Sequence, residues 1–407
     1  MGAENDKRQL KTLAVHAGEA PDPATWASAP NIVMSTTYIA DPDASFSAED
    51  FGENTPYIYT RWGNPTIAQL ERKLAALEGA EAGLAFASGM AAVSGLFLGT
   101  LRAGDHLVLS DVSYAGTAEF ANDFLPRFGI EVTRADFSDL GAVAAAVKPN
   151  TRLIYAESPA NPIARLTDLA AVATIAKAAG ALFTVDSTFA TPVATRPITL
   201  GADFVVQSLT KYIGGHGDAL GGAILGRAVD IGSLRKGIGI HGGGTLSPFN
   251  AWLILRGAAT LPIRMKAHEE GALTVARFLE GHPAVTRVIY PGLPSHPQAE
   301  LARRQMKNFS GMLTFQVKDG PAMARQLAKR LKVIHYAVSL GHQRSLVFYL
   351  STDDMLRTSF RLSPKGEASY RAYAGEGIFR LSVGLEDPID LCADLADALD
   401  PMSCTRL

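Results

Sequence analysis

The 407-residue sequence predicts an α/β fold, in which a large domain built on a mostly parallel sheet precedes a smaller α+β domain. Two observations support this fold class. Between residues 63 and 262, short apolar runs of strand length alternate with segments of helical periodicity, which is typical of a parallel sheet covered on both faces. Beyond Pro262 one long helix is followed by several strands. We therefore expect an arm over residues 1–62, a large domain over 63–262 and a small domain over 263–407.

The expected elements follow from caps, apolar faces and turn residues. The first helix of the large domain begins at Asn64-Pro65, an N-cap followed by proline at the first helical position, and ends at Gly79. Its further elements are strands at 83–87, 106–109, 152–156, 182–185, 203–206 and 221–225, and helices from 88, through 120–124 and over 166–180. The small domain should hold a helix over 268–280 and strands at 285–290, 312–317, 346–350 and 378–383. The first 60 residues, rich in Pro, Ser and Asp, should form an extended arm.

Composition argues against several classes of function. The chain carries 38 Lys and Arg against 40 Asp and Glu, and its net charge of -2 gives no long-range field to attract nucleic acid or an anionic membrane. Residues 82–100 carry no charge, but their glycines favour a strand, a turn and a buried helix over a membrane span. With two cysteines, Cys392 and Cys404, and no apolar leader in the first ten residues, we expect a cytoplasmic protein without a disulfide framework.

Three expected strands end in residues suited to chemistry, because ligands of open α/β sheets bind beyond the carboxyl ends of the strands. Ser88-Gly89-Met90 opens a helix whose free N–H groups suit a phosphate, with a plain serine cap as the alternative. Asp186 ends an apolar strand and needs a cationic partner if it is buried. Lys211 follows another strand, where burial would lower its pKa as a Schiff-base amine requires, although by itself it could equally reach the surface.

Together these groups match pyridoxal 5'-phosphate (PLP) better than any other cofactor. PLP needs an anion site for its phosphate, a carboxylate for its ring nitrogen and an amine for its aldehyde. At about 4 Å and an effective dielectric near 20, the carboxylate and the protonated ring attract by about 4 kcal/mol, which favours the protonated ring. The sequence holds no metal-binding motif. A G-x-G-x-x-G pattern at 237–242 follows a charged run and not a strand, so a dinucleotide site is not expected.

Seven ordered motifs carry a resemblance to a known enzyme family. They are YIYTRWGNPT at 57–66, SGMAA at 88–92, ESPANP at 157–162, VDST at 185–188, SLTKYIGGHG at 208–217, LSPFNA at 246–251 and RLSVG at 380–384. Through them nearly the whole chain resembles the Cys/Met metabolism (trans-sulfuration) family of PLP-dependent enzymes, which includes methionine γ-lyase, cystathionine γ-synthase, cystathionine γ- and β-lyases and homoserine-ester sulfhydrylases. The resemblance implies PLP-dependent transferase fold type I, aspartate aminotransferase-like, with a seven-stranded, mostly parallel sheet in the large domain.

The resemblance also implies a role for each matching residue. Lys211 would bond to the cofactor aldehyde, Asp186 would hold the ring nitrogen, and Tyr114 would stack on the ring and act in proton transfer. Arg380, assisted by Ser339, would bind the substrate carboxylate, for which a planar guanidinium is well suited. The other implied cofactor contacts are Ser88, Gly89, Met90, Ser208 and Thr210 at the phosphate, and Asn161 at the ring hydroxyl.

The implied enzyme is a homo-oligomer acting on a small amino acid. Tyr59 and Arg61 would reach the phosphate and substrate of the neighbouring subunit, so the catalytic unit would be a dimer and the assembly a tetramer. The expected reaction is γ-elimination or γ-replacement on a sulfur amino acid or homoserine ester, because residues 246–255 are most similar to the γ-acting members. β-Elimination, a non-catalytic protein on the same fold and an NAD-dependent oxidoreductase are the alternatives, and the motifs leave lyase and synthase undecided.

A few positions depart from the family pattern. Leu209 replaces a small residue near the lysine, and Gly116 stands where methionine γ-lyases commonly carry a cysteine, which makes a strict methionine lyase less expected. After Ser339 the family usually continues Gly-Asp with an acid soon after, whereas this chain has His342 and Arg344. These two residues suggest either an entrance that prefers an anionic side chain or ordinary solvated loop residues.

Overall fold

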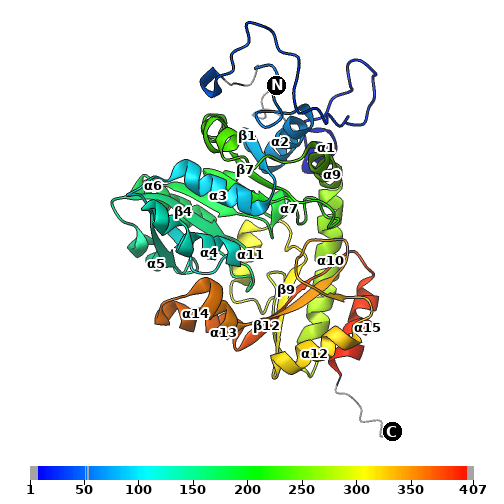
Figure 1. Cartoon of the computed structure of the whole chain (residues 1–407). Coiled ribbons are helices and arrows are strands. Elements are labelled where there is room, and N and C mark those ends of the chain that lie inside the picture. Colours follow the sequence, from blue (N-terminus) through cyan, green and yellow to red (C-terminus); the bar gives the residue numbers. More distant parts are fainter. Residues whose placement is uncertain (1–7, 51, 53–54, 401–407) are drawn as a thin grey trace.

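The computed structural model describes residues 8–50, 52 and 55–400, which form two sheets, each with its own helices (Figure 1). The larger sheet has the strand order β1-β7-β6-β5-β4-β2-β3. Its strands are β1 Ala82–Phe86, β2 His106–Ser110, β3 Glu131–Ala135, β4 Thr151–Glu157, β5 Leu182–Asp186, β6 Phe204–Ser208 and β7 Gly222–Gly226. β7 pairs antiparallel with both of its neighbours, β1 and β6, and all other neighbouring strands of this sheet pair in parallel. The expected seven-stranded, mostly parallel sheet is confirmed.

Helices cover both faces of this sheet (Figure 1). They are α2 Pro65–Glu78, α3 Gly89–Thr100, α4 Ala115–Asp123, α5 Leu140–Ala146, α6 Leu169–Ala179, α7 Thr191–Ala194, α8 Ala228–Leu234 and α9 Pro248–Ala259, with 3-10 turns Leu125–Phe128 and Pro197–Leu200 and a π turn Arg235–Gly239. Successive strand residues pack to opposite sides: Leu107 and Leu109 join the cluster of Phe97, whereas Val108 joins that of Val172. Burial on both faces explains the continuous apolar runs of the sequence.

The start and end of α2 follow the local signals in the sequence. The Asn64 side chain accepts hydrogen bonds from the backbone N–H groups of Thr66 and Ile67, which have no partner within the helix. Gly79 ends the helix with φ 77°, a left-handed conformation that glycine adopts without strain. The predicted bounds of this helix are confirmed.

The C-terminal part of the chain forms a second, smaller unit on a sheet of order β10-β11-β12-β9-β8 (Figure 1). Its strands are β8 Val285–Ile289, β9 Met312–Val317, β10 His335–Tyr336, β11 Leu346–Ser351 and β12 Gly377–Ser382. Its helices are α10 Leu261–Glu280, α11 Ala299–Gln305, α12 Gly320–Arg330, α13 Thr352–Met355, α14 Pro364–Ala374 and α15 Pro388–Leu399, with a π turn Leu356–Phe360. Val275 of α10 and Leu395 of α15 pack on Phe315 and Phe379 of the sheet, which gives this α+β unit its own core.

Several elements differ from the sequence prediction. β3 and α5 were not expected, because β3 is a largely half-exposed edge strand without an apolar run and α5 is a short alanine-rich helix. α6 begins at Leu169 with Asp168 as its cap, so Leu166 precedes the helix. α10 begins at Leu261, before the expected start at 268, because Pro262 is tolerated in the first turn of a helix.

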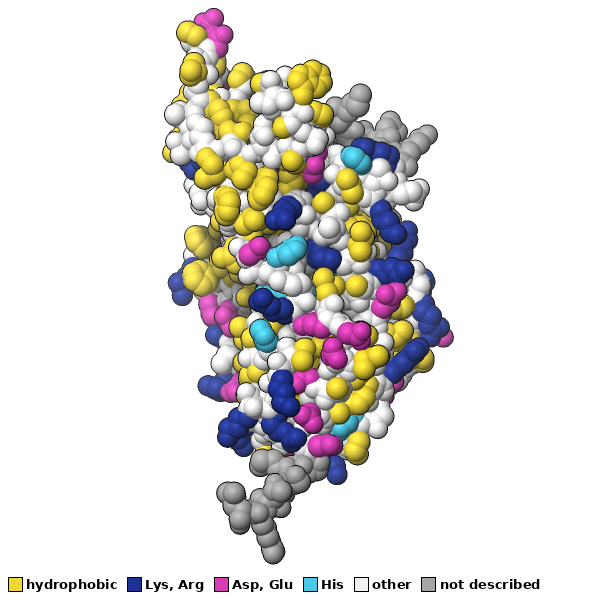
Figure 2. Space-filling model, turned by 90° about the vertical axis from the view of Figure 1, so that its right-hand side faces the viewer, with side chains coloured by type: hydrophobic (Ala, Val, Ile, Leu, Met, Phe, Trp, Pro, Cys, Tyr) yellow, Lys and Arg dark blue, Asp and Glu magenta, His cyan; other side chains and the backbone are white. Residues whose placement is uncertain are grey.

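The N-terminal arm is not wholly extended. It holds α1 Leu10–His16 and a 3-10 turn Ala48–Asp50. α1 is fastened to α2, since Lys73 Nζ donates to the backbone oxygens of Ala14 at 2.6 Å and Val15 at 3.1 Å. The rest of the arm exposes large apolar side chains, namely Trp26, Met34, Ile39 and Phe46. Figure 2 shows hydrophobic side chains gathered at the upper end of the molecule, which is the end that the arm occupies in Figure 1.

None of the helices in the described part of the chain is long and apolar enough to cross a membrane. Residues 8–50, 52 and 55–400 also bring no three potential metal-ligating side chains together. Cys392 carries a free, half-buried thiol in α15. Cys404 and the first seven residues, on which two of the expectations rest, lie outside the described residues.

Candidate active site

Lys211 lies three residues beyond the end of β6, on a turn that faces the smaller unit. Its Nζ donates to the Ser339 hydroxyl oxygen at 2.9 Å. The pKa of Lys211 is lowered to about 8, mainly by burial and in addition by the positive charge of Arg380. The amine therefore loses its proton far more easily than a solvated lysine, which is the property that a nucleophilic amine needs.

Asp186 ends β5, the strand next to β6 in the sheet. The carboxylate is buried, and it accepts hydrogen bonds from the backbone N–H of Thr188 at 3.0 Å and from the Tyr155 hydroxyl at 3.4 Å. Burial raises the pKa of Asp186. Among the described residues no Lys, Arg or His forms a salt bridge with it, so the expected cationic partner is not a side chain of this part of the chain. A buried carboxylate without a protein cation suits a cationic ring nitrogen.

Glu157 is a second buried carboxylate at the same edge, and the sequence analysis gave it no role. It ends β4 and lies directly opposite Asp186 in the strand register. One oxygen accepts from the backbone N–H of Tyr114 at 2.6 Å and the other from that of Asn161 at 2.8 Å. Burial raises the pKa of Glu157, and the neighbouring charge of Asp186 adds to this. The strand-end argument used for Asp186 would have found it.

Arg380 enters the site from β12 of the smaller unit. Its guanidinium donates to the Asn161 side-chain oxygen at 2.9 Å and to the Ser339 carbonyl at 3.2 Å. Burial lowers its pKa to about 10, which leaves it charged at neutral pH. Within the described residues Arg380 forms no salt bridge. A half-buried cation held by neutral acceptors can bind a carboxylate from a ligand.

The helix start at Ser88 lies against the end of β6. The Ser88 hydroxyl caps α3 by accepting from the backbone N–H of Ala91 at 3.1 Å, which leaves the amides of Gly89 and Met90 directed out of the helix end. A Cβ on Gly89 would lie 3.0 Å from both Cβ and Oγ of Ser208, so a larger residue would push α3 away from the strand. This places backbone donors beside the Ser208 hydroxyl, in an arrangement suited to phosphate.

Thr210 and Tyr114 complete the set at this edge. The Thr210 hydroxyl donates to the backbone oxygen of Gly221 at 3.2 Å and fixes the turn before Lys211. Tyr114 precedes α4 and is 47% exposed, so its ring borders an open space. A Cβ on Gly116 would lie 2.8 Å from the Tyr114 ring, and a cysteine there would therefore displace that ring from its present position.

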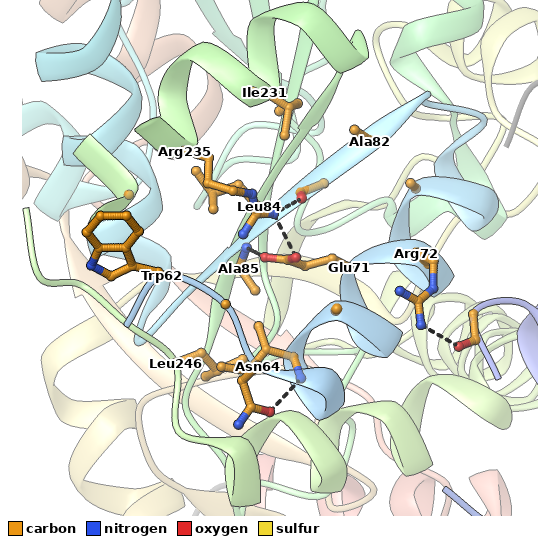
Figure 3. A pocket seen from close by; sticks show the side chains of 18 of the residues that line it. Trp62, Asn64, Glu71, Arg72, Ala82, Leu84, Ala85, Ile231, Arg235 and Leu246 are labelled. Atoms are coloured by element: carbon orange, nitrogen blue, oxygen red, sulfur yellow. Dashed lines mark hydrogen bonds and ion pairs between the residues drawn. The ribbon is translucent and has the colours of Figure 1, made fainter. Parts of the chain in front are cut away.

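Tyr59 and Arg61 lie apart from this cluster. The Arg61 guanidinium lies 5.6 Å from the centroid of the Tyr59 ring and donates to the Ile240 carbonyl at 2.6 Å. Arg61 lines a cavity of about 1200 Å³ between the arm, α2, β1 and α8 (Figure 3). Figure 3 shows Arg235 and Glu71 paired there, at 2.7 Å. Ser88, Asp186 and Lys211 do not line this cavity.

The strand-end residues fit PLP. Three groups lie at one edge of the sheet: the half-buried Lys211 amine with its lowered pKa, the buried Asp186 carboxylate, which has no salt bridge to a described residue, and the helix start at Gly89, where a Cβ would crowd Ser208. Arg380 adds a site for a substrate carboxylate. PLP chemistry requires each of these groups.

Comparisons with known proteins agree with this fit. The sequence model of the Cys/Met metabolism PLP-dependent enzymes matches residues 11–400. The chain is 42% identical to a canavanine γ-lyase of Pseudomonas canavaninivorans, over 97% of this chain and 98% of that one. It is also 42% identical to an O-succinylhomoserine sulfhydrylase of Pseudomonas aeruginosa, over 95% and 94% of the two chains. The crystal structure of metB from Corynebacterium glutamicum superimposes with a TM-score of 0.86 at 37% identity, covering 97% of this chain and 98% of that one.

Proposed function

Because the chain belongs to the Cys/Met metabolism family of PLP-dependent enzymes, we propose that it catalyses γ-elimination or γ-replacement on an amino acid, with Lys211 as the central catalytic residue. Relatives that are similar over nearly their whole length include a γ-lyase and a homoserine-ester sulfhydrylase, so both reaction types belong to the proposal. The substrates are sulfur amino acids, homoserine esters or amino acids with a comparable γ-leaving group.

One observation carries the proposal: the Lys211 amine and the Arg380 guanidinium meet at Ser339. Ser339 accepts from the lysine through its hydroxyl at 2.9 Å and from the arginine through its carbonyl at 3.2 Å. An amino acid whose carboxylate is bound by Arg380 would therefore present its α- and β-carbons near the Lys211 amine. Such placement of the reacting groups supplies a large share of catalytic acceleration.

The residues of the chain have separate roles in this proposal. PLP, when bound, supplies an electron sink for negative charge at the α-carbon of the substrate. Lys211 would hold the aldehyde carbon until the substrate amino group replaces it there, and its released amine would then move protons at the α- and β-carbons. Asp186 keeps the ring nitrogen protonated, and Arg380 binds the substrate carboxylate.

The remaining cofactor and substrate contacts are proposed on the same grounds. Tyr114 stacks on the ring and takes part in proton transfer, while Asn161 contacts the ring hydroxyl. Ser88, Gly89, Met90, Ser208 and Thr210 bind the phosphate. Glu157 joins them as a positioning residue, because it holds the backbone of both Tyr114 and Asn161.

We further propose that the active enzyme is a cytoplasmic homotetramer whose catalytic unit is a dimer. The exposed apolar side chains of the arm support burial against another subunit. In that dimer Tyr59 and Arg61 reach the phosphate and substrate of the neighbouring site. The domain division at 62/63 and 262/263 belongs to this proposal, and the start of α10 at Leu261 lies close to the second boundary.

Product analysis tests the reaction. The purified protein is incubated with methionine, cystathionine, cysteine, canavanine and O-succinylhomoserine, each with and without an added thiol. A 2-oxo acid and ammonia from a γ-substituted substrate indicate elimination, and a new thioether indicates replacement. Pyruvate formed from cysteine or cystathionine alone would point to β-elimination. A colourless protein that takes up no PLP would refute the proposal.

A further inference from the structure

The segment that follows Ser339 packs directly on the turn that carries Lys211. Gly341 has φ +73°, and a Cβ there would lie 2.6 Å from the backbone nitrogen of Tyr212 and 3.2 Å from Cα of Lys211. Two residues further on, the backbone N–H of Gln343 donates to the carbonyl of Gly215 at 3.0 Å. Residues 341–343 are therefore fixed against the lysine turn at two points.

Ser339 lies between two titratable side chains. Its hydroxyl oxygen is 2.9 Å from Lys211 Nζ and 3.3 Å from His342 Nε2. Its φ of +91° is unusual for a residue with a side chain, and such strain is typically stored at functional sites. The three side chains thus form a hydrogen-bonded row from the half-buried Lys211 amine to the half-buried His342 imidazole.

The imidazole of His342 lies where a side chain at Gly217 would otherwise be. A Cβ on Gly217, in the glycine loop after the lysine, would lie 2.8 Å from the His342 ring, so only glycine lets the ring lie there. The charged groups that face the ring are Lys211, Arg344 and Asp218. Burial and the two cations lower the pKa of His342 below its ordinary value of 6.5, while Asp218 opposes them. The ring is therefore neutral at pH 7.

We propose that His342 is a positioning residue. Its neutral imidazole accepts a hydrogen bond from the Ser339 hydroxyl and thereby turns the lone pairs of the Ser339 oxygen toward Lys211. A hydroxyl has one proton to donate and two lone pairs to accept with. When the proton points to Nε2, the oxygen remains free to accept from the lysine. The inference rests on the proposed function, since it concerns the same lysine, but it adds a residue at which this chain departs from the family pattern.

Protonation of His342 reverses this arrangement. Both ring nitrogens of a charged imidazole are donors, so Nε2 then competes with Lys211 for the Ser339 oxygen. Because the pKa of His342 is lowered from 6.5, we expect this change at the site only at a more acid pH than for a solvated histidine.

His342→Gln, which keeps a hydrogen-bonding group and removes the titration, is compared with His342→Leu, which removes both. The control is His335→Gln, because His335 is an exposed histidine of the same unit. In the PLP-bound enzyme, the visible absorbance is followed against pH. We expect wild type and His335→Gln to show a step below pH 6.5 that His342→Gln lacks, and the acid limb of kcat in His342→Gln to move down by about one pH unit. His342→Leu should lower kcat by about tenfold at pH 7 and above, and this difference from wild type should shrink at acid pH, where the wild-type imidazole is protonated.

A double-mutant cycle with Ser339→Ala separates this relay from a general effect of charge. If His342 acts through Ser339, replacing it in the Ser339→Ala background changes neither the spectral step nor the acid limb. Equal effects of His342→Gln in both backgrounds, an unchanged acid step in His342→Gln, or full activity of His342→Leu would overturn the inference. A protein without a PLP absorbance band would refute the proposed function instead.

Discussion

At the scale of single residues, the surroundings of Lys211 disfavour the charged form of its amine. Burial lowers the pKa of Lys211 from 10.5 to about 8, and the hydroxyl of Ser339 is a neutral acceptor that compensates this only in part. A pKa that is lower in the folded chain than in the unfolded chain destabilises the fold wherever the amine is protonated, which is below pH 8. The destabilisation fades as pH rises from about 8 to 10.5.

Lys211→Met should therefore stabilise the cofactor-free protein at neutral pH. Methionine keeps most of the side-chain volume and removes the charge, so the free energy of unfolding at pH 7 should rise by about 1–3 kcal/mol. Denaturant unfolding at several pH values provides the measurement. The difference from wild type should be largest below pH 8 and shrink toward pH 10.5, and a difference that is constant over this range would contradict the assigned cause.

The same lysine should be indispensable for turnover. Lys211→Ala removes the amine that we propose holds the cofactor and moves protons, so kcat should fall by about 1000-fold or more. The matched control is Lys177→Ala, since Lys177 is an exposed lysine on α6. Circular dichroism should show both variants folded. Wild-type turnover by Lys211→Ala would refute the role of this residue.

At the scale of elements, the start of α3 can lie close to the end of β6 because Gly89 has no Cβ. The 3.0 Å approach of a virtual Gly89 Cβ to Ser208 means that any side chain at this position must move the helix start or the strand end. The N–H groups of the first turn would then no longer meet the phosphate together with the Ser208 hydroxyl. If this helix start binds the phosphate as proposed, cofactor affinity should be sensitive to a single methyl group at this point.

Gly89→Ala should weaken PLP binding by about tenfold or more, because a displaced helix start loses hydrogen bonds to the anion. PLP titration followed by absorbance measures this. Gly232→Ala on α8 is the control, since a Cβ there meets nothing within 4 Å, and it should leave PLP affinity unchanged while stabilising the helix by about 0.5–1 kcal/mol. Equal PLP affinity of Gly89→Ala and wild type would show that the helix start does not bind the phosphate.

At the scale of the whole molecule, the proposed site joins groups from both sheets and from a second subunit. Lys211 and Asp186 come from the large sheet, and Arg380 comes from β12 of the small one. Arg61 lies apart from them in its own chain and contacts Ile240. If the dimer is the catalytic unit, each site combines the lysine of one subunit with the arm of the other.

Mixing two inactive variants tests this arrangement. Arg61→Ala should retain PLP poorly, and Lys211→Ala should be inactive. A dimer with one copy of each still holds one site with both residues intact, so random reassociation should restore about one quarter of the wild-type activity. Activity is measured after the separately purified variants are dissociated and reassociated together. If activity is not recovered although size-exclusion chromatography detects dimers, Arg61 does not contribute to the active site of the other subunit.

Much of the fold was predictable because its signals are local. Asn64, Pro65 and Gly79 set the ends of α2, and continuous apolar runs marked the central strands. The edge strand β3 and the short helix α5 were missed, since a half-exposed edge lacks such a run. The order of the strands and the antiparallel direction of β7 depend on pairings between distant segments and left no mark on the strands themselves.

The sequence alone determined which residue types end the strands of the large sheet, and hence that an amine, a carboxylate and a helix start suited to phosphate lie at one edge. This follows because parallel strands align their carboxyl ends. Only the tertiary structure decided what surrounds them. The Tyr155 hydroxyl donates to Asp186, the backbone N–H of Tyr114 donates to Glu157, and hydrogen bonds connect Lys211 through Ser339 to His342. These contacts join segments far apart in the chain, and burial by those segments sets the pKa of each group, so local sequence patterns could not reveal them.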